Sequence, residues 1–328
     1  MDKQQDSRFG IVAIGRNEGE RLRRCLRSLP VPARVVYVDS GSTDGSDIWA
    51  RDFGAEVVHL DISTRFTAAR ARNAGFLRLT ELAPQITYVQ FIDGDCEMAD
   101  GWPAAAIAFL QNHADVAAVF GRRRERSPDW SIYNRLCDWE WDGPVGEARA
   151  CGGDVMMRAA PLKATGGYRE SLIAGEEPEL CVRLRAAGWR IWRLNAEMTL
   201  HDAAMTRFSQ WWKRNMRSGY AFAEGAHLHG APPERHWVWE SRRAWIWGIW
   251  LPQLCIAAGL ILPPWGLIVL CVYPLQMLRQ TCRGSGELRE RVIKSFFQVL
   301  CRFPEAWGQI QFTRDRLLRR EASLIEYK

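Results

Sequence analysis

The chain has 328 residues, of which 47% are hydrophobic and 25% charged, and its formal net charge is +6. This composition supports a well-packed core and argues against a largely disordered chain. The nine cysteines include no CxxC pair, which argues against a disulfide framework or a zinc ribbon and favours reduced thiols. The polar start, MDKQQDSRFG, has no signal-peptide pattern. We therefore expect the catalytic part of the protein to lie in the cytoplasm.

Apolar strands alternate with helices over the first 125 residues. The pattern predicts strands at 9–15, 34–39, 56–60, 88–93 and 116–120, and helices at 44–53, 66–79 and 100–112. Continuous apolar strands separated by helices predict an α/β fold, a Rossmann-like and mostly parallel sheet with helices on both faces. Residues 121–205 are less regular, with a helix expected near 178–187 and a strand at 189–194, and a further helix is expected at 206–223.

Polar residues follow three of the predicted strands. They are Asn17-Glu18, Asp39-Ser40 and Asp93-Gly94-Asp95. Ligands of parallel α/β sheets bind at the carboxyl ends of the strands. We therefore expect these three groups to rim one crevice.

The Asp93-Gly94-Asp95 group places two carboxylates at the tip of a buried strand. Alternate residues of an extended chain point to the same side, and Gly94 lets a bulky ligand approach the backbone. Two like charges this close repel unless a cation lies between them. Hard oxygen donors of this kind suit Mg²⁺ or Mn²⁺ shared with a diphosphate. An isolated DxD is otherwise read as a surface turn.

Asp39 opens the stretch DSGSTDGS, which has two readings. It is a tight loop that caps the next helix, or Asp39 accepts hydrogen bonds from a nucleobase. No GxGxxG or GxxxxGK[ST] motif is present, which weighs against a dinucleotide cofactor and against an ATPase-type phosphate loop.

Three carboxylates, Glu176, Glu177 and Glu179, precede or begin a predicted helix. Acidic side chains in a first turn favour the helix dipole, so capping is one role. A carboxylate that projects into a cleft is instead a candidate general base. Glu177 and Glu176 are our candidates for that base.

Residues 244–278 contain no charged side chain. The run 244–262 would be about 28 Å long as a helix at ~1.5 Å per residue, close to one hydrocarbon core. The run 265–278 is shorter and holds Pro274, so two spans and a re-entrant or interfacial hairpin both stay open, beside a buried hairpin in a soluble protein. Arg242-Arg243 and Arg279 flank the block, which predicts cytoplasmic flanks.

Positive charge gathers at the C-terminal end. Residues 279–328 hold eleven Lys/Arg and six Asp/Glu, a balance of +5, and fourteen of the sixteen Trp lie beyond residue 128. A basic segment indicates nucleic acid or membrane lipid, and indole rings concentrate at membrane interfaces. We therefore expect a membrane partner and no nucleic acid, with 281–328 as a basic amphipathic segment.

The motifs IGRNE, VDSGSTDGS, FIDGD, CGGD, AGEEPEL and LHD occur in this order between residues 8 and 215. As an ordered set they resemble the family 2 glycosyltransferases, which have a GT-A fold. This resemblance implies that Asp39 binds uracil and that Asp93 and Asp95 bind diphosphate and metal. It also implies that His201 completes the metal shell, although a structural pair with Asp202 is the alternative.

The resemblance extends to the base and to further nucleotide-sugar contacts. The family has a Glu-Asp pair where this chain has Glu176-Glu177, so Glu177 replaces an Asp by a residue one methylene longer. Further nucleotide-sugar contacts are expected from the side chains Asn17, Glu18, Arg72, Asp93, Asp154 and Arg214. Arg214 stands in QWWKR, a degenerate form of the QxxRW motif. The alternative is that QWWKR belongs to a membrane-proximal amphipathic helix. For Arg72, the alternative is a solvated position on a helix surface.

The resemblance implies inverting transfer of a sugar from a nucleotide-sugar, with UDP expected, to an acceptor hydroxyl. Together with the hydrophobic block it predicts a lipid-linked or cell-envelope glycan acceptor at the inner membrane, with the catalytic domain facing the cytoplasm. The expected domains are 1–225, 240–280 and 281–328. The alternatives are a sugar-nucleotide nucleotidyltransferase and a non-catalytic, membrane-bound partner protein.

Overall fold

The computed structural model describes residues 8–31 and 33–320, except the side chain of Leu267. The chain divides into two compact units. The sheet unit comprises Met1–Leu172 and Glu176–Thr206, and the helical unit comprises Ile173–Gly175 and Arg207–Lys328. The expected segment 281–328 is therefore described only as far as residue 320, and α9 (Phe208–His229) belongs to the helical unit rather than to the sheet unit.

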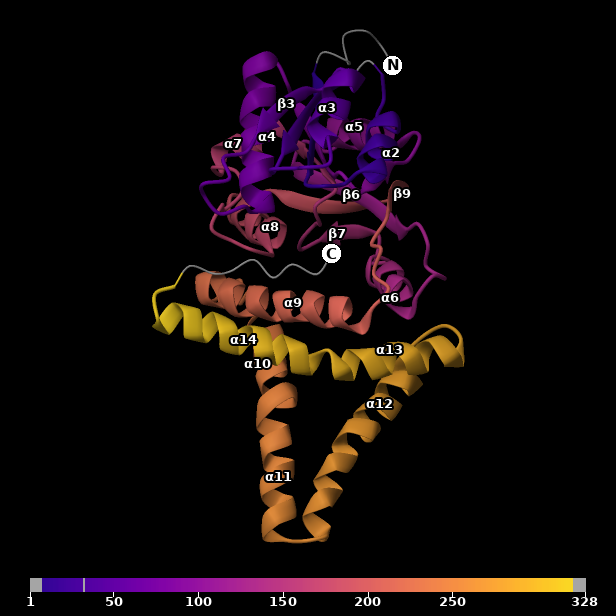
Figure 1. Cartoon of the computed structure of the whole chain (residues 1–328), viewed down its shortest axis with the longest axis vertical. Helices are drawn as coiled ribbons and strands as arrows, with labels where there is room; N and C mark the ends of the chain where they lie inside the picture. The colour runs from indigo at the N-terminus through magenta and orange to yellow at the C-terminus, as the bar shows by residue number, and fades with distance from the viewer. Residues whose placement is uncertain (1–7, 32, 321–328) are drawn as a thin grey trace. The chain divides into compact units, whose positions relative to one another are not determined.

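The sheet unit is built on a mixed sheet in the order β3-β2-β1-β4-β8-β6-β9-β5, with β7 paired to β9. Figure 1 labels β3, β6, β7 and β9 of this sheet. The strands are β1 (Phe9–Gly15), β2 (Arg34–Asp39), β3 (Glu56–His59), β4 (Tyr88–Asp93), β5 (Cys96–Met98), β6 (Val116–Glu125), β7 (Gly146–Ala148), β8 (Val155–Arg158) and β9 (Arg190–His201). Strands β3, β2, β1 and β4 pair in parallel, as do β6 and β9. Strand β8 runs antiparallel to both β4 and β6.

Helices cover both faces of this sheet. They are α2 (Glu20–Arg27), α3 (Ser46–Phe53), α4 (Ala68–Leu82), α5 (Trp102–Asn112), α6 (Ile132–Glu140), α7 (Ala159–Ala164) and α8 (Glu176–Ala186). Side chains alternate between faces along a strand: Ile11 and Ala13 join one buried cluster with α2, α3 and α5, and Val12 and Ile14 join a second with α4, α7 and α8. The predicted fold class is confirmed.

Strands β6 and β9 are longer than the sequence indicates. The expected strand at 116–120 continues to Glu125, and the one at 189–194 continues to His201. The extension Gly121-Arg122-Arg123-Arg124-Glu125 has no apolar run, so local pattern marks it as a loop. It is held as a strand by parallel pairing with β9, whose register places Glu125 opposite His201 after bulges near Phe120 and Arg122.

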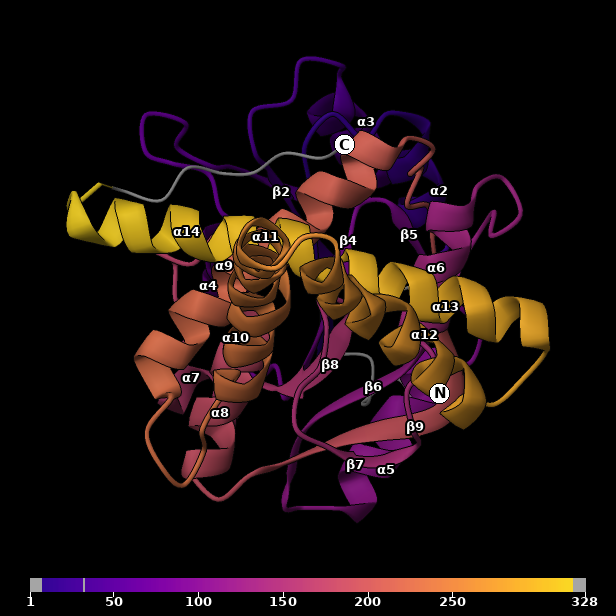
Figure 2. The same ribbon diagram turned by 90° about the horizontal axis from the view of Figure 1, so that it is seen from below.

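The helical unit contains the remaining helices. They are α9, α10 (Val238–Trp245), the π-helix η1 (Ile246–Trp250), α11 (Leu251–Ile261), the 3₁₀ helix η2 (Trp265–Cys271), α12 (Val272–Arg283), α13 (Leu288–Leu300) and α14 (Arg302–Leu317). Two glycines bring α9 close to α14. A Cβ at Gly308 would lie 2.0 Å from the Met216 carbonyl oxygen, and one at Gly219 would lie 2.0 Å from that of Glu305. Figure 2 shows α13 and α14 end to end, with α10–α11 and α12 leaving them.

The uncharged block forms a hairpin within this unit. Figure 1 shows α11 and α12 as two arms that meet near residues 262–264. Within 8–31 and 33–320, one helix of 24 residues, Val238–Ile261, is long and apolar enough to cross a membrane by length and composition. Large apolar side chains on this hairpin are exposed, among them Trp250, Leu254, Leu260, Trp265 and Leu275. The choice between two spans and an interfacial hairpin stays open.

Candidate active site

The carboxyl edge of the sheet gathers several of the predicted site residues. Strands β2, β4, β6 and β9 all end there, with Asp39, Asp93, Glu125 and His201 as their last residues. Because β8 runs antiparallel to β4, its first residues lie at the same edge, and the Asp154 side chain accepts a hydrogen bond from the Asp93 amide at 3.0 Å. The carboxyl ends of β2, β4, β6 and β9 thus lie at the same edge of the sheet as the start of β8.

One buried arginine holds three carboxylates at this edge. Arg72 of α4 is 2% exposed, and its Nη1 lies 2.8 Å from Glu176 Oε1 and 2.9 Å from Glu177 Oε1. Its Nη2 lies 2.9 Å from Asp93 Oδ1. We call Arg72, Asp93, Glu176 and Glu177 the Arg72 cluster. A Cβ at Gly153 would lie 2.4 Å from Arg72 Nη2, so only a glycine leaves room for the guanidinium here.

Glu177 of the Arg72 cluster has a raised pKa. Burial, followed by the neighbouring charge of Glu176, raises the pKa of Glu177 to about 7, and Arg72 opposes this rise only in part. A carboxylate with such a pKa takes up and releases protons near neutral pH, as a general base must. Glu179, by contrast, is 1% exposed and held by Arg183 and Arg169 at 2.7 and 3.1 Å, a purely structural pairing.

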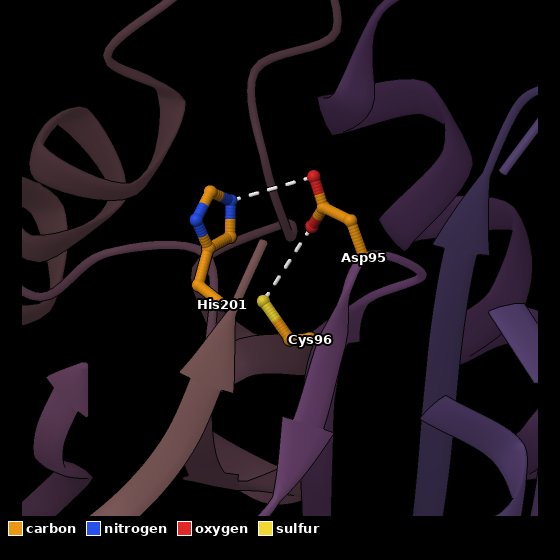
Figure 3. Close-up of side chains that lie close together, drawn as sticks. All are labelled: Asp95, Cys96 and His201. Carbon is orange, nitrogen blue, oxygen red and sulfur yellow. Dashed lines mark hydrogen bonds and ion pairs between the residues drawn. The ribbon is translucent and has the colours of Figure 1, made fainter. Parts of the chain in front are cut away.

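A second group lies at the ends of β6 and β9. Figure 3 shows His201 Nε2 facing Asp95 Oδ2 at 3.4 Å and the Cys96 thiol donating to Asp95 Oδ1 at 3.5 Å. On the other side of the ring, His201 Nδ1 lies 3.6 Å from Glu125 Oε2. We call Asp95, Cys96, Glu125 and His201 the His201 cluster. Burial, then the nearby Arg123, lowers the pKa of His201, which favours the neutral imidazole that metal ions require.

The His201 cluster fits a hard divalent cation. Ligand atoms of Asp95, Cys96 and His201 lie within 4.8 Å of one another. Burial raises the pKa of the Cys96 thiol well above its usual value, so this sulfur stays protonated and the oxygen and nitrogen donors remain. The Asp95 carboxylate suits Mn²⁺ or Mg²⁺, and His201 adds a nitrogen donor. Glu125 stands behind the ring as an orienting carboxylate does in metal sites.

Asp93 and Asp154 have strong protein partners. Asp93 lies near Arg72 and also 3.5 Å from Arg123 Nη2. Asp154 is 1% exposed, accepts from Thr199 Oγ1 at 2.7 Å and lies 3.5 Å from Arg123 Nε. These contacts position the end of β4, and they favour Asp95 over Asp93 as the metal ligand. Nucleotide-sugar contacts of Asp93, Asp154 and Arg72 stay predictions.

The loops after β1 and β2 are tied to each other. Asp39 is 3% exposed, and its Oδ2 accepts from the amides of Gly41 and Ser42 at 3.0 and 2.9 Å, the turn that short polar residues form. Asn17 Oδ1 accepts from the Thr43 amide at 2.7 Å. Glu18 pairs with Arg21 at 2.8 Å. This geometry supports the tight-loop reading of Asp39, and its contact with a nucleobase stays a prediction.

A family model, glycosyl transferase family 2, matches residues 11–164. The succinoglycan biosynthesis protein ExoA of Rhizobium meliloti is 31% identical over 53% of this chain and 54% of its own length, so the chain spans about half of that relative. An uncharacterized glycosyltransferase of Mycobacterium bovis is 31% identical over 55% of this chain and 79% of its own length. The chain belongs to glycosyl transferase family 2.

Solved structures show the same fold for this family 2 chain. A mannosyltransferase, PcManGT from Pyrobaculum calidifontis, in complex with GDP-Man and Mn²⁺, gives a TM-score of 0.60 at 17% identity, over 94% of this chain and 88% of that one. S. aureus TarS 1–349 gives 0.51 at 14% identity, over 89% of this chain and 90% of that one. At such identities the likeness shows the fold alone.

Some residues of this family 2 site were not found from the sequence. Arg123, Glu125, Cys96 and Trp141 all contact predicted site residues, and the Trp141 ring lies 4.8 Å from that of His201 and 4.9 Å from the Arg123 guanidinium carbon. No local signal marks Arg123 and Glu125, because their segment forms a strand through its pairing with β9. Arg214 lies on α9 of the helical unit, and its role stays a prediction.

Proposed function

We propose that this protein transfers a sugar from a nucleotide-sugar to an acceptor hydroxyl, with inversion at the anomeric carbon. The observation that carries the proposal is the Arg72 cluster, in which a carboxylate with a pKa of about 7, Glu177, shares Arg72 with Asp93 at the carboxyl edge of the sheet. The edge thus presents a proton acceptor next to residues suited to a diphosphate and its cation.

Glu177 acts as the general base in this proposal. It accepts the proton of the acceptor hydroxyl while that oxygen forms a bond to the anomeric carbon and the opposite bond, to the diphosphate, breaks. A single displacement of this kind inverts the configuration. Arg72 keeps Glu177 oriented through the 2.9 Å contact, and burial, followed by the charge of Glu176, raises the pKa of Glu177.

Asp95 and His201, with Asp93 beside them, would hold Mg²⁺ or Mn²⁺. Such an ion stabilises the negative charge that develops on the leaving diphosphate. The Mn²⁺ and GDP-Man in the similar mannosyltransferase support a divalent ion and a nucleotide-sugar. We retain UDP as the expected nucleotide, with Asp39 at its base and Asn17, Glu18, Asp154 and Arg214 as further candidate contacts.

We place the acceptor at a membrane. The exposed apolar hairpin of the helical unit, with Arg242-Arg243 before it and Arg279 and Arg283 after it, suits insertion from the cytoplasmic side of the inner membrane. A relative in succinoglycan biosynthesis supports a lipid-linked or envelope glycan as acceptor. Flotation of the full chain with vesicles of phosphatidylcholine, with and without phosphatidylglycerol, tests this placement, and failure to float with either would remove it.

The test of activity is release of nucleoside diphosphate by the full chain from a panel of UDP- and GDP-sugars, with Mn²⁺ or with EDTA. We expect release from at least one donor, raised by Mn²⁺ and by a lipid-phosphate acceptor. Release of pyrophosphate from a sugar phosphate and a nucleoside triphosphate would identify a nucleotidyltransferase instead. Neither product, together with no Mn²⁺-dependent thermal shift, would identify a non-catalytic partner protein.

A further inference from the structure

Two cysteine sulfurs meet directly behind the Arg72 cluster. Cys151 Sγ and Cys181 Sγ lie 3.5 Å apart inside the sheet unit. Cys151 is 6% exposed and Cys181 is 0% exposed. Cys151 lies in the loop that leads to Gly153 and Asp154, and Cys181 lies on α8, one helical turn after Glu177. Neither thiol has a part in the proposed sugar transfer.

The two thiols are chemically unlike. The hydrogen bond between them lowers the pKa of Cys181 and raises that of Cys151, in which burial acts in the same direction. A thiolate is the reactive form of cysteine toward oxidants. The contact therefore marks Cys181 as the more acidic sulfur, and the 3.5 Å separation keeps Cys151 within reach as its resolving partner.

We propose that Cys151 and Cys181 form a redox-sensitive dithiol, a modification site at which hydrogen peroxide produces an intrachain disulfide. One sulfur attacks the peroxide to give a sulfenic acid and water, and the other sulfur displaces a second water from it. Two S–H bonds and one O–O bond break, and one S–S bond and two O–H bonds form. The sulfurs lose two electrons and the peroxide gains them. A dithiol reductant reverses the change.

The disulfide acts on the geometry of the candidate active site. A disulfide bond is about 2.05 Å long, so the sulfurs must approach by roughly 1.5 Å from their 3.5 Å separation. This movement draws α8 toward the loop of Gly153, which has no free space beside Arg72. We infer that Glu177 shifts relative to Arg72 and Asp93. Displacements of about 1 Å in an active site cost on the order of 10²-fold in rate.

Peptide mapping of the full chain tests the modification itself. Trypsin releases Cys151 in peptide 150–158 and Cys181 in peptide 170–183, and each peptide holds a single cysteine. After treatment with hydrogen peroxide, we expect these two peptides joined, two mass units below their summed mass, and separated by dithiothreitol. Cys137→Ala, which changes another buried cysteine of the sheet unit, should leave the joined species. Absence of the 150–158 to 170–183 link would overturn the proposal.

A second measurement tests the effect of the disulfide on activity. It rests on the proposed sugar transfer, whereas the test of the peptide link does not. Peroxide should lower nucleoside diphosphate release by about tenfold or more, and dithiothreitol should restore it. Cys151→Ala and, as a second variant, Cys181→Ala should keep their release in peroxide. If the disulfide forms but nucleoside diphosphate release is unchanged, the proposed effect on activity is wrong. If both variants lose release in peroxide as much as the native chain does, other groups cause the loss.

Discussion

The Arg72 cluster and the His201 cluster solve the burial of carboxylates in different ways. In the first, one fixed guanidinium contacts Asp93, Glu176 and Glu177 at 2.8 to 2.9 Å. In the second, Asp95 and Glu125 face an imidazole whose pKa is lowered, so the ring brings little positive charge at neutral pH. Buried charge needs a compensating partner. The first cluster therefore carries its cation in the protein. In the second, Glu125 accepts hydrogen bonds from Ser127, Asn134 and Ala203, and we expect Asp95 and His201 to bind an ion from solution.

This contrast assigns different roles to similar residues. A carboxylate beside a permanent cation is oriented and tuned, as Glu177 is by Arg72 and Glu176. For Asp95, which lies beside the neutral His201 ring, we expect the role of a ligand to an ion. Arg123, within 3.5 Å of both Asp93 and Asp154, lies between the two arrangements.

The largest effect is expected for Glu177→Gln. An amide cannot accept the acceptor's proton, so turnover should fall by about 10²- to 10⁴-fold, measured as nucleoside diphosphate release with saturating donor. Glu197→Gln, at an exposed carboxylate paired with Arg124, is the control and should retain activity. Equal turnover of Glu177→Gln and the native chain would remove Glu177 from the base role.

Arg72→Ala tests whether the first cluster depends on its fixed cation. It leaves three carboxylates without their common partner, and loss of one member of a buried pair costs about 3–5 kcal/mol, measured as unfolding free energy in urea. Arg78→Ala, on the same helix and paired with Glu56 at the surface, should change stability little. Similar losses for the two variants would contradict the special position of Arg72.

His201→Ala tests whether the second cluster takes up an ion. Mn²⁺ at about 100 times its dissociation constant should stabilise the native chain by about 2.7 kcal/mol, seen as a rise in melting temperature, and His201→Ala should lose most of this rise. His59→Ala, at an exposed histidine, should retain it. A full Mn²⁺ response without the His201 imidazole would break the comparison.

The pH dependence of kcat/KM tests whether the protonation of Glu177 controls activity. Because its pKa is raised to about 7, Glu177 keeps its proton below that pH and is an active base above it. We expect kcat/KM to fall about tenfold per pH unit on the acid side. In Glu176→Gln the like charge is gone, so the midpoint should move to lower pH. An unmoved midpoint would assign the titration to another group.

The smallest effect is expected for Thr199→Val. The variant removes one hydrogen bond to buried Asp154, which should cost about 1 kcal/mol of unfolding free energy and leave Mn²⁺ binding intact. Thr80→Val, at an exposed hydroxyl that bonds the Leu77 carbonyl, is the control. A strong loss of Mn²⁺ binding in Thr199→Val would show that Asp154 is coupled to the ion.

The strands that could be predicted from the sequence are those with a continuous apolar run. Strands β1, β2 and β4 have the predicted bounds because each is a continuous apolar run. The ends of β6 and β9 were missed because their charged and polar residues are held by pairing between the two strands. That pairing is a property of the sheet order, which no local periodicity encodes.

The same limit applies to the site. Asp93, Asp95 and His201 were found from motifs, but the place of Glu125 beside His201 follows from the parallel register of β6 and β9. Arg72 was expected at the nucleotide, and its contacts join it to Glu176, 104 positions further along the chain. Contacts between residues so far apart in the sequence form only in the folded chain, so the local sequence does not predict them.

The reversed direction of β8 has a consequence for how this edge of the sheet can change. The chain leaves the edge at Glu125 and returns to it at Asp154, so the whole excursion 126–153, with α6 and β7, begins and ends beside the same strand tips. The excursion is tied to the rest of the sheet unit by β7, which pairs with β9, and by Asn134 of α6, which donates to Glu125. One continuous segment thus borders the tips of β4, β6 and β9, and we expect changes in its length to alter this border more than the parallel core of the sheet.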